Sequence, residues 1–442
     1  MFSKVLVANR GECAVRIIRA CKELGLSTVA IYSKVDSISP HVLLADECVC
    51  IGKDTPKSSY LNSINILSAA KLKGADAIHP GIGFFAEDDC FAKLCGECGI
   101  TFIGADPSAL EIMGDKMSAK QFVSKLNIPV VPGTLDTISN ISDAERIAKE
   151  IGYPVIIKAV GGGGGKGIRV VRSPEEFTHM FTQCEKEAEN AFRNKGLIIE
   201  MFLQAARHVE VQIMADRFGN VVHLGERECS VQSGKQKFIE EAPCDFIPVP
   251  VKHKLYRDAM EIARAVGYVG VGTVEFLVTP DEQYYFMEMN TRLQVEHTIT
   301  EMISGIDIVI EQIRIHSGEG LSVKQDDVCL SGHSIECRIC LSSKNKGKHI
   351  NFDMLPGGFD VRMECGIMNG STVTWYYDPL LLKVIVKARD RVDAIKKMKA
   401  ALDEVIFIGI MTNLDAHKTT LNDACFLEGR YNINDFEHRF KI

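Results

Sequence analysis

Five consecutive glycines at residues 161–165 constrain the fold of this chain more than any other feature of its sequence. The apolar segment IGYPVIIKAV at 151–160 precedes them, and IRVVRS at 168–173 follows after Lys166 and Gly167. Because glycines carry no side chain, their backbone can approach an anion closely and offer N–H groups to it. The pattern predicts two strands joined by a glycine-rich tip. Taken alone, this tip fits either a mobile lid over nucleotide phosphates or a plain flexible surface loop.

Two familiar phosphate-binding loops do not match this segment. A Walker A motif would require glycine at position 160, which is Val160, and serine or threonine directly after Lys166. A GxGxxG match at 162–167 leads into a strand-like segment and not into a helix, which argues against a Rossmann fingerprint. Lys158, inside the apolar strand before the glycines, either reaches out to solvent or is aimed at a phosphate, and the neighbouring glycines favour the phosphate.

A second signal is a run in which a polar side chain stands at every second position. Its members are Glu288, Asn290, Arg292, Gln294 and Glu296. On an extended chain they would all project from one face. Glu275, a lone acid in the apolar segment TVEFLV, would be costly to bury unpaired. If Glu275 and Glu288 lie on neighbouring strands, they can share Mg²⁺, which binds carboxylates and nucleotide phosphates; the alternative is a salt-bridged pair of strands.

The remaining patterns predict more than one lobe, because 442 residues exceed one ordinary compact core. Short apolar strands alternate with helical patterns in the first hundred residues, which predicts a parallel sheet. These strands are expected at 4–9, 27–33, 75–79 and 100–104, with the first helix at 13–24. After His208 the strands become antiparallel in character. Further helices are expected at about 115–131, 175–192 and 300–317.

Composition excludes several partners and locations. A net charge of −7 without basic blocks does not suit a protein that coats nucleic acid or an anionic membrane.

The N-terminus lacks a signal-peptide pattern and no stretch approaches about 18 uninterrupted apolar residues, so we expect a cytoplasmic protein without a transmembrane helix. The 15 cysteines are then expected to be reduced. Two CxxC pairs, Cys95/Cys98 and Cys337/Cys340, are expected to be structural thiols and not zinc ligands.

Many segments, in matching order over nearly the whole chain, resemble the biotin carboxylase branch of the ATP-grasp superfamily. The most diagnostic are GGGGGKG at 161–167 and EMNTRLQVEH at 288–297. The resemblance implies an ATP-grasp fold of mixed α/β and α+β class. It further implies a Rossmann-like N-terminal domain at 1–114, a linker and ATP-binding lid at 115–203, and the ATP-grasp core with a C-terminal mixed domain at 204–442.

The same resemblance implies a reaction and its partners. The chain would use ATP, Mg²⁺ or Mn²⁺, and bicarbonate to carboxylate biotin on a carrier protein through carboxyphosphate. This is the first half-reaction of a biotin-dependent carboxylase such as acetyl-CoA carboxylase in fatty acid biosynthesis. Because the chain lacks an AMKM-type biotin attachment lysine, the biotin carboxyl carrier protein and the carboxyltransferase are expected to be separate partners. A homodimer is also implied, whereas the final carboxyl acceptor is not.

Roles carry over to individual residues of this sequence. ATP would be bound by Lys116, Lys158, Gly164, Gly165, Glu200, Met201, Phe202, Leu203, His208, Gln232 and Lys235. The metal would be held by Glu275, Glu288 and Asn290, and bicarbonate by Lys237, Arg292, Gln294 and Val295. Glu296 would be the general base, assisted by Lys237 and Arg292, and Arg338 would bind biotin and stabilise its enolate. Two cations beside a carboxylate suit this task, because the cations hold the anion while the base accepts its proton.

Three features depart from the family pattern. Ile82 replaces a tyrosine that lies near biotin, Lys235 replaces a histidine that helps to hold ATP, and the segment after Arg338 is shorter than usual. These changes bear on biotin and ATP affinity. At the expected dimer interface, Arg16, Arg19 and Glu23 share one helical face, which could equally be a solvated charged surface.

Two other functions are also compatible with the sequence. The chain could be an ATP-grasp ligase that activates a different carboxylate, which Ile82 and the shortened segment would suit. It could also be a non-catalytic nucleotide-binding subunit of a carboxylase complex. The presence of Glu275, Glu288, Arg292, Glu296 and Arg338 argues against the second, since a dead site would be free to lose them.

Overall fold

The computed structural model describes residues 2–159, 167–192, 196–233, 236–342, 345, 348–372 and 374–436. Gly164, Gly165 and Lys235 lie outside the described residues. The chain forms two compact units. The larger holds Met1–Gly114, Arg207–Glu275 and Met289–Ile442, and the smaller holds Asp115–Ala206 and Phe276–Glu288.

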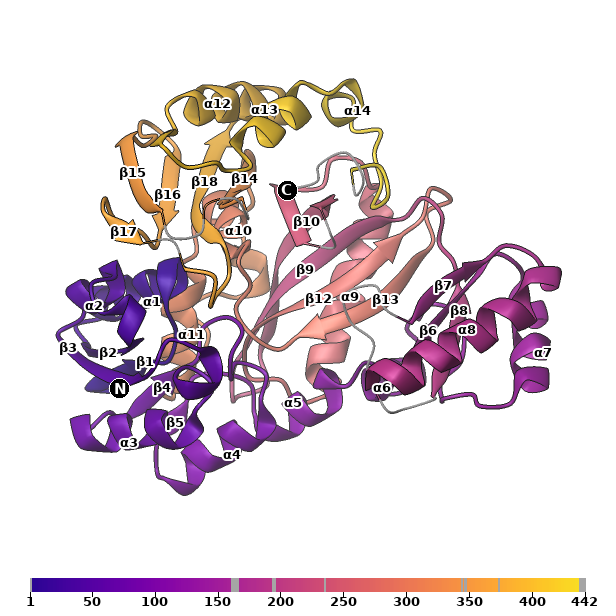
Figure 1. Cartoon of the computed structure of the whole chain (residues 1–442), viewed down its shortest axis with the longest axis horizontal. Coiled ribbons are helices and arrows are strands. Elements are labelled where there is room, and N and C mark those ends of the chain that lie inside the picture. Colours follow the sequence, from indigo (N-terminus) through magenta and orange to yellow (C-terminus); the bar gives the residue numbers. More distant parts are fainter. Residues whose placement is uncertain are drawn as a thin grey trace. The chain divides into compact units, whose positions relative to one another are not determined.

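The N-terminal part of the larger unit is a parallel sheet, as the alternating sequence pattern predicts. Its strand order is β3-β2-β1-β4-β5 within the described residues (Figure 1). The strands are β1 (Lys4–Val7), β2 (Ser27–Ser33), β3 (Glu47–Gly52), β4 (Ala77–His79) and β5 (Thr101–Phe102). The helices are α1 (Gly11–Glu23), η1 (Lys34–Asp36), α2 (Pro40–Leu44), η2 (Pro56–Ser58), α3 (Ser63–Lys73), α4 (Asp89–Glu97) and α5 (Pro107–Gly114). Apolar side chains fill both faces of the sheet, as a buried parallel sheet requires.

A second sheet, predominantly antiparallel, carries most of the polar residues singled out in the sequence. Its strand order over the described residues is β13-β12-β9-β10-β11-β14-β18-β16. These strands are β9 (Arg207–Ala215), β10 (Val221–Ser233), β11 (Gln236–Ala242), β12 (Gly270–Val278), β13 (Tyr284–Asn290), β14 (His333–Cys340), β16 (Val361–Cys365) and β18 (Leu380–Ala388). The neighbouring strands from β9 through β10, β11, β14 and β18 to β16 pair antiparallel, which confirms the character predicted after His208. Helix α9 (Val249–Ala265) connects β11 to β12.

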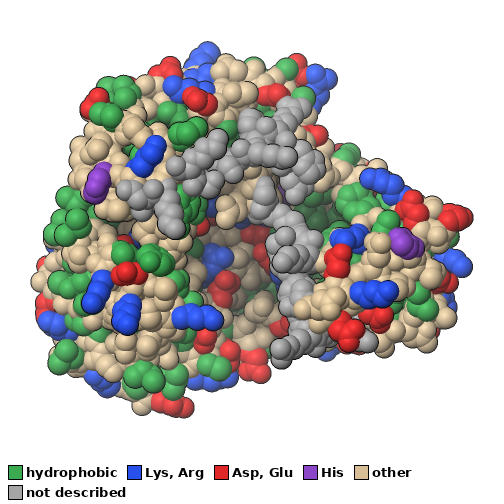
Figure 2. Space-filling view, viewed as in Figure 1, with side chains coloured by type: hydrophobic (Ala, Val, Ile, Leu, Met, Phe, Trp, Pro, Cys, Tyr) green, Lys and Arg blue, Asp and Glu red, His purple; other side chains and the backbone are tan. Residues whose placement is uncertain are grey.

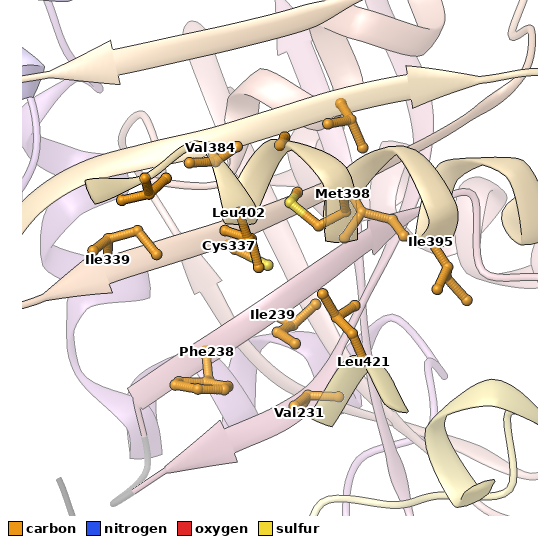
Figure 3. Close-up of a cluster of buried hydrophobic side chains, with 14 of the residues drawn as sticks. Val231, Phe238, Ile239, Cys337, Ile339, Val384, Ile395, Met398, Leu402 and Leu421 are labelled. Carbon is orange, nitrogen blue, oxygen red and sulfur yellow. The ribbon is translucent and has the colours of Figure 1, made fainter. Parts of the chain in front are cut away.

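One face of the carboxy-terminal part of this sheet is apolar and covered by helices. Side chains of β10, β11, β14 and β18 pack there against α12 (Arg391–Asp403) and α13 (Leu414–Asn422) (Figure 3). Phe426 of α14 (Ala424–Leu427) belongs to the same cluster. Cys337 and Val384 point into this core, whereas their strand neighbours point to the opposite face. The apolar face thereby fixes the direction of the polar one. A small sheet of β17 (Ser371–Thr372), β15 (His349–Met354) and β19 (Ile406–Ile408) completes this part of the fold.

The smaller unit is built around the predicted pair of strands. β6 (Val155–Ala159) and β7 (Ile168–Val171) are antiparallel, which confirms the predicted pair of strands, whereas the glycines at 161–165 lie outside the described residues. β8 (Leu197–Met201) pairs with the other edge of β6. Helices α6 (Lys116–Lys125), α7 (Ile141–Ile151) and α8 (Pro174–Phe192) accompany this sheet. Buried side chains of α7 and α8 pack with those of the strands, which makes the unit a small α+β body.

Three predicted segments differ from the structure. The expected helix at 115–131 ends at Lys125, because Asn127 adopts a left-handed conformation with φ 59° before Pro129. The expected helix at 300–317 is two helices, α10 (His297–Ser304) and α11 (Ile308–His316). They separate at Gly305, which has φ 71°, and Asp307 then caps α11. The extended run expected through Glu296 ends at Asn290, and residues 291–296 turn into α10.

The cysteines and the predicted charged helix face can both be located in the structure. All 15 cysteines are free, and neither CxxC pair is among the metal-capable groups found in the described residues. Arg16, however, is buried and pairs with Glu301 and Asp307 at 3.0 and 2.6 Å, so it does not share an exposed face with Arg19. Charges of both signs are interspersed on the face shown in Figure 2. None of the described helices is long and apolar enough to cross a membrane.

A buried ion-pair cluster fastens α12 to β11. Arg391 donates from Nε and Nη2 to the two carboxylate oxygens of Glu241, at 2.7 and 2.9 Å. His333 and Tyr431 contact the same carboxylate at 3.0 and 2.8 Å. Burial alone would raise the pKa of Glu241, but His333 and Arg391 hold it at about 2.

Replacing Arg391 with methionine is expected to destabilise the fold by about 3–5 kcal/mol, because one partner of a buried pair is removed. The measurement is the urea midpoint of unfolding followed by circular dichroism. The control is Arg389→Met, since Arg389 is 83% exposed and its loss should cost less than about 0.5 kcal/mol. Equal midpoints for the two variants would show that the cluster contributes no stability.

Candidate active site

The centre of the polar network is the ammonium group of Lys237 on β11. Its Nζ lies 2.5 Å from Glu210, 2.9 Å from Glu275 and 2.5 Å from Glu296. Burial alone would lower the pKa of Lys237, but these three carboxylates raise it well above its ordinary value. The network therefore holds a charged lysine among acids that come from β9, β12 and the turn before α10.

Glu296 lies between two cations. Lys237 contacts its Oε1, and Nη2 of Arg338 on β14 lies 3.1 Å from its Oε2. Burial would raise the pKa of Glu296, but Lys237 and then Arg338 hold it well below the usual range for a carboxyl. The Glu296 side chain is only 3% exposed, so it is an ionised carboxylate shielded from bulk water. Such a group can accept a proton only from a partner that reaches it directly.

Glu275 joins the predicted metal, nucleotide and bicarbonate residues. Its Oε1 accepts from Asn290 and Gln294, each at 2.8 Å, and its Oε2 lies 2.9 Å from Nε2 of His208. Burial would lower the pKa of His208, but Glu275 raises it. Gln232, predicted beside the nucleotide, lies 2.9 Å from the other ring nitrogen of His208.

Arg292 and Val295 lie in the turn between β13 and α10, and not on the extended strand that the alternating pattern predicts. Arg292 pairs with Glu87 at 2.8 Å and reaches Asn290 Oδ1 at 3.1 Å, which links it to the network through Asn290. The carbonyl oxygen of Val295 accepts from Lys383. The structure thus gathers these residues through a turn and not through a strand face.

The smaller unit holds the predicted phosphate lysines. Lys158 on β6 lies 2.6 Å from Glu200 on β8, and Lys120 contacts the same carboxylate at 2.7 Å. Burial would raise the pKa of Glu200, but Lys158 and Lys120 lower it. Lys116 pairs with Glu288 at 2.8 Å, and Met201, Phe202 and Leu203 continue from β8 as half-buried residues.

Several residues of the network are not among those that the sequence patterns indicated. They are Glu210, Arg227, Glu240, Lys120 and Lys383. Arg227 is fully buried and contacts Glu210, Gln212, Thr273, Gln294 and Thr300. The signal that could have found part of this set is the polar alternation His208, Glu210, Gln212 on β9, which places three polar side chains on one face of a buried strand.

Arg338 also pairs with a second buried acid. Its guanidinium contacts Glu240 on β11, and Glu240 stands opposite Glu336 in the β11–β14 register. Burial, together with repulsion from Glu336, raises the pKa of Glu240 to about 8 in spite of Arg338. Glu240 is therefore a carboxyl that is largely protonated in the folded protein at neutral pH.

This shift predicts a pH-dependent stability. The ordinary pKa of a glutamate is 4.5, so the unfolded chain loses the proton of Glu240 first and the folded protein keeps it up to about pH 8. The stabilisation is complete below about pH 4.5 and is lost as the pH rises through about 8. Wild type should therefore lose about 1.4 kcal/mol per pH unit relative to Glu240→Gln between about pH 5 and 8. Urea unfolding of both proteins across this range checks it, and parallel stability curves would contradict it.

Comparison with known proteins identifies the family. The model of the biotin carboxylase N-terminal domain matches residues 1–110, and that of the biotin carboxylase C-terminal domain matches 336–438. Between them, the ATP-binding domain of the carbamoyl-phosphate synthase L chain matches 115–324. Biotin carboxylase 1 of Bacillus subtilis is 47% identical over 99% of this chain and 98% of that protein. Biotin carboxylase of Haemophilus influenzae is 45% identical over 99% of both.

Solved structures give the same result. The biotin carboxylase–β-γ-ATP complex of Campylobacter jejuni covers 98% of both chains at 42% identity, with a TM-score of 0.93. The biotin carboxylase domain dimer of Hydrogenobacter thermophilus 2-oxoglutarate carboxylase, which holds MgADP, ADP and bicarbonate, covers 98% of this chain and 96% of that one at 43% identity, with a TM-score of 0.91. The chain has the ATP-grasp fold of these proteins and belongs to the biotin carboxylase family.

Proposed function

We propose that this chain is an ATP-dependent ligase that carboxylates biotin on a carrier protein with bicarbonate. The observation that carries the proposal is the buried carboxylate of Glu296 between Lys237 and Arg338. In the absence of substrate, the two cations balance the acid. A bound bicarbonate would share these two cations. Less positive charge would then stabilise the ionised form of Glu296, so its pKa would rise and it would accept a proton more readily.

The proposed first step is attack of a bicarbonate oxygen on the γ-phosphorus of ATP. The bond to the ADP oxygen breaks, and the proton of bicarbonate goes to Glu296. Lys237, Arg292, Gln294 and Val295 would hold the anion in line, which removes much of the entropic barrier. Lys116 and Lys158, with Gly164 and Gly165, would contact the ATP phosphates, and Glu200, Met201, Phe202, Leu203, His208, Gln232 and Lys235 would hold the rest of the nucleotide.

The proposed second step transfers the carboxyl group. Carboxyphosphate decomposes to CO₂ and phosphate, and the phosphate takes the N1 proton of biotin. A new bond then forms between N1 and the carbon of CO₂. Arg338 would stabilise the negative charge that develops on the ureido oxygen. Ile82 packs against the N-terminal apolar cluster, so we expect the biotin site to lack the polar contact that tyrosine would give.

A divalent cation fits the donors in this chain. Glu275 offers a buried carboxylate next to Asn290, and Glu288, two residues before Asn290, offers a second one. Carboxylate and amide oxygens suit Mg²⁺ or Mn²⁺, and Mg²⁺ keeps further positions for phosphate oxygens. When bound, the cation would offset the charge of the transferring phosphoryl group.

Partners and organisation complete the proposal. We expect the chain to act as the biotin carboxylase subunit with a separate biotin carboxyl carrier protein and a carboxyltransferase, and to form a homodimer. Arg19, 50% exposed, and Glu23 remain available on α1 for that interface. We further propose the domain division 1–114, 115–203 and 204–442. We also propose a cytoplasmic location, although two of the similar proteins, from Populus trichocarpa, are chloroplastic.

ADP release, measured with and without bicarbonate and free biotin, tests the function. The proposal expects turnover that needs ATP, Mg²⁺ and bicarbonate and rises with biotin, and chelation of the metal should abolish it. Turnover with another carboxylic acid but not with bicarbonate would replace the proposal by a different ATP-grasp ligase. Nucleotide binding without any bicarbonate-dependent hydrolysis would point to a non-catalytic subunit.

A further inference from the structure

Lys383 on β18 is a fully buried lysine to which the proposed chemistry gives no task. It stands directly opposite Arg338 in the β14–β18 register and opposite Glu364 in the β16–β18 register. Residues opposite each other on antiparallel strands share one face. Its neighbours Leu382 and Val384 belong to the apolar cluster of Figure 3, so Lys383 points to the same side of the sheet as Arg338.

The ammonium group of Lys383 is held by three oxygens. Its Nζ lies 2.5 Å from the carbonyl oxygen of Val295, 3.5 Å from Glu12 and 3.9 Å from Glu336. Burial alone would lower the pKa of Lys383, but attraction from Glu12 and then Glu336 raises it above its ordinary value. The lysine is therefore charged, and its bond to Val295 is a charge-assisted hydrogen bond in a low-dielectric site.

The hydrogen bond to Val295 acts on the backbone next to the proposed base. The Val295 carbonyl and the Glu296 N–H belong to one planar peptide unit, so a fixed carbonyl also fixes the plane from which the Glu296 side chain departs. Residues 291–296 lie outside any helix or strand, so no regular pattern of backbone hydrogen bonds fixes their conformation. Thr298, in the first turn of α10, donates to Glu336, the same acid that lies beside Lys383.

We propose that Lys383 is a positioning residue that fixes the Val295–Glu296 peptide and thereby the geometry of the bicarbonate site. This inference rests on the proposed function. Lys383 acts through the backbone and does not touch the substrate. Glu12 on α1 holds the ammonium from the side of the N-terminal domain, so one lysine ties this domain to the catalytic turn.

The test compares Lys383→Met with Lys387→Met in the full-length protein. Lys387 lies on the same strand, is partly exposed, and donates from its ammonium group to Ser331 at the surface. For Lys383→Met we expect kcat for bicarbonate-dependent ADP release to fall about 100-fold, as for a misplacement of about 1 Å, and the KM for bicarbonate to rise about 10-fold. The Kd for ATP should change less than twofold. Lys387→Met should match wild type in all three quantities.

The Kd for ATP separates positioning from general damage, because a merely structural role would not change bicarbonate kinetics selectively. Wild-type kinetics in Lys383→Met, or equal losses for ATP and bicarbonate, would overturn the inference. If Lys383→Met does not fold, Lys383→Arg keeps the charge but changes the donor geometry at Val295, and unchanged bicarbonate kinetics there would overturn it equally. A wild-type protein without bicarbonate-dependent ADP release would instead refute the proposed function.

Discussion

Replacing Glu296 with glutamine is expected to reduce bicarbonate-dependent ADP release about 1000-fold. A positioned general base contributes about 100- to 10,000-fold, and glutamine keeps the shape of the side chain but cannot take the proton. The Kd for ATP should stay within twofold, because the proposed nucleotide contacts lie elsewhere. Initial rates at saturating ATP, together with equilibrium binding of ATP, measure both effects.

Glu261→Gln is a suitable control for this variant, since Glu261 is exposed on α9 and should not affect turnover. If Glu296→Gln turned over like wild type, the base would have to be another group. Glu210 would then be the first candidate, because it is the other buried carboxylate that lies 2.5 Å from Lys237.

Replacing Arg338 with methionine is expected to separate the two half-steps. Carboxylation of biotin should fall about 100- to 1000-fold, the usual cost of removing one donor to a developing oxyanion. ADP release with bicarbonate alone should fall less than about 10-fold, because Lys237 still pairs with Glu296. Labelled bicarbonate fixed on biotin and ADP release without biotin are the two measurements.

Arg389→Met, at an exposed position on the same part of the chain, serves as the control for Arg338→Met. Equal losses in both reactions would contradict the separate role of Arg338 and would show that it acts mainly by balancing the charge of Glu296.

Much of the fold follows from local patterns. The apolar strands and helical spacing of the first hundred residues predict a parallel sheet correctly, because each βαβ unit is encoded over a short stretch. Two apolar segments around the glycines correctly predict the antiparallel pair β6 and β7. The break between α10 and α11 was missed because Gly305 and Asp307 stand within an otherwise continuous apolar pattern.

The candidate site was predictable in its residue types and not in its geometry. The alternating run indicated that Asn290, Gln294 and Glu296 lie together, but as a strand face. Gln294 and Glu296 meet instead because a turn brings them to Arg227 and Lys237, from which they are 67 and 59 residues apart in the sequence. Asn290, at the end of β13, joins them through its hydrogen bond to Glu275. Local periodicity does not contain such long-range pairs. Lys383 lies 88 residues after Val295 in the sequence, so local periodicity does not indicate this pair either.

The most direct test of the account is the fate of oxygen from bicarbonate labelled with ¹⁸O. If bicarbonate attacks the γ-phosphorus, one labelled oxygen stays on the phosphate when carboxyphosphate loses CO₂. Mass spectrometry of the phosphate, at times short compared with exchange of bicarbonate with water, should find one ¹⁸O for each ADP formed. Phosphate that carries oxygen from water alone would show that ATP is hydrolysed directly and would contradict the account.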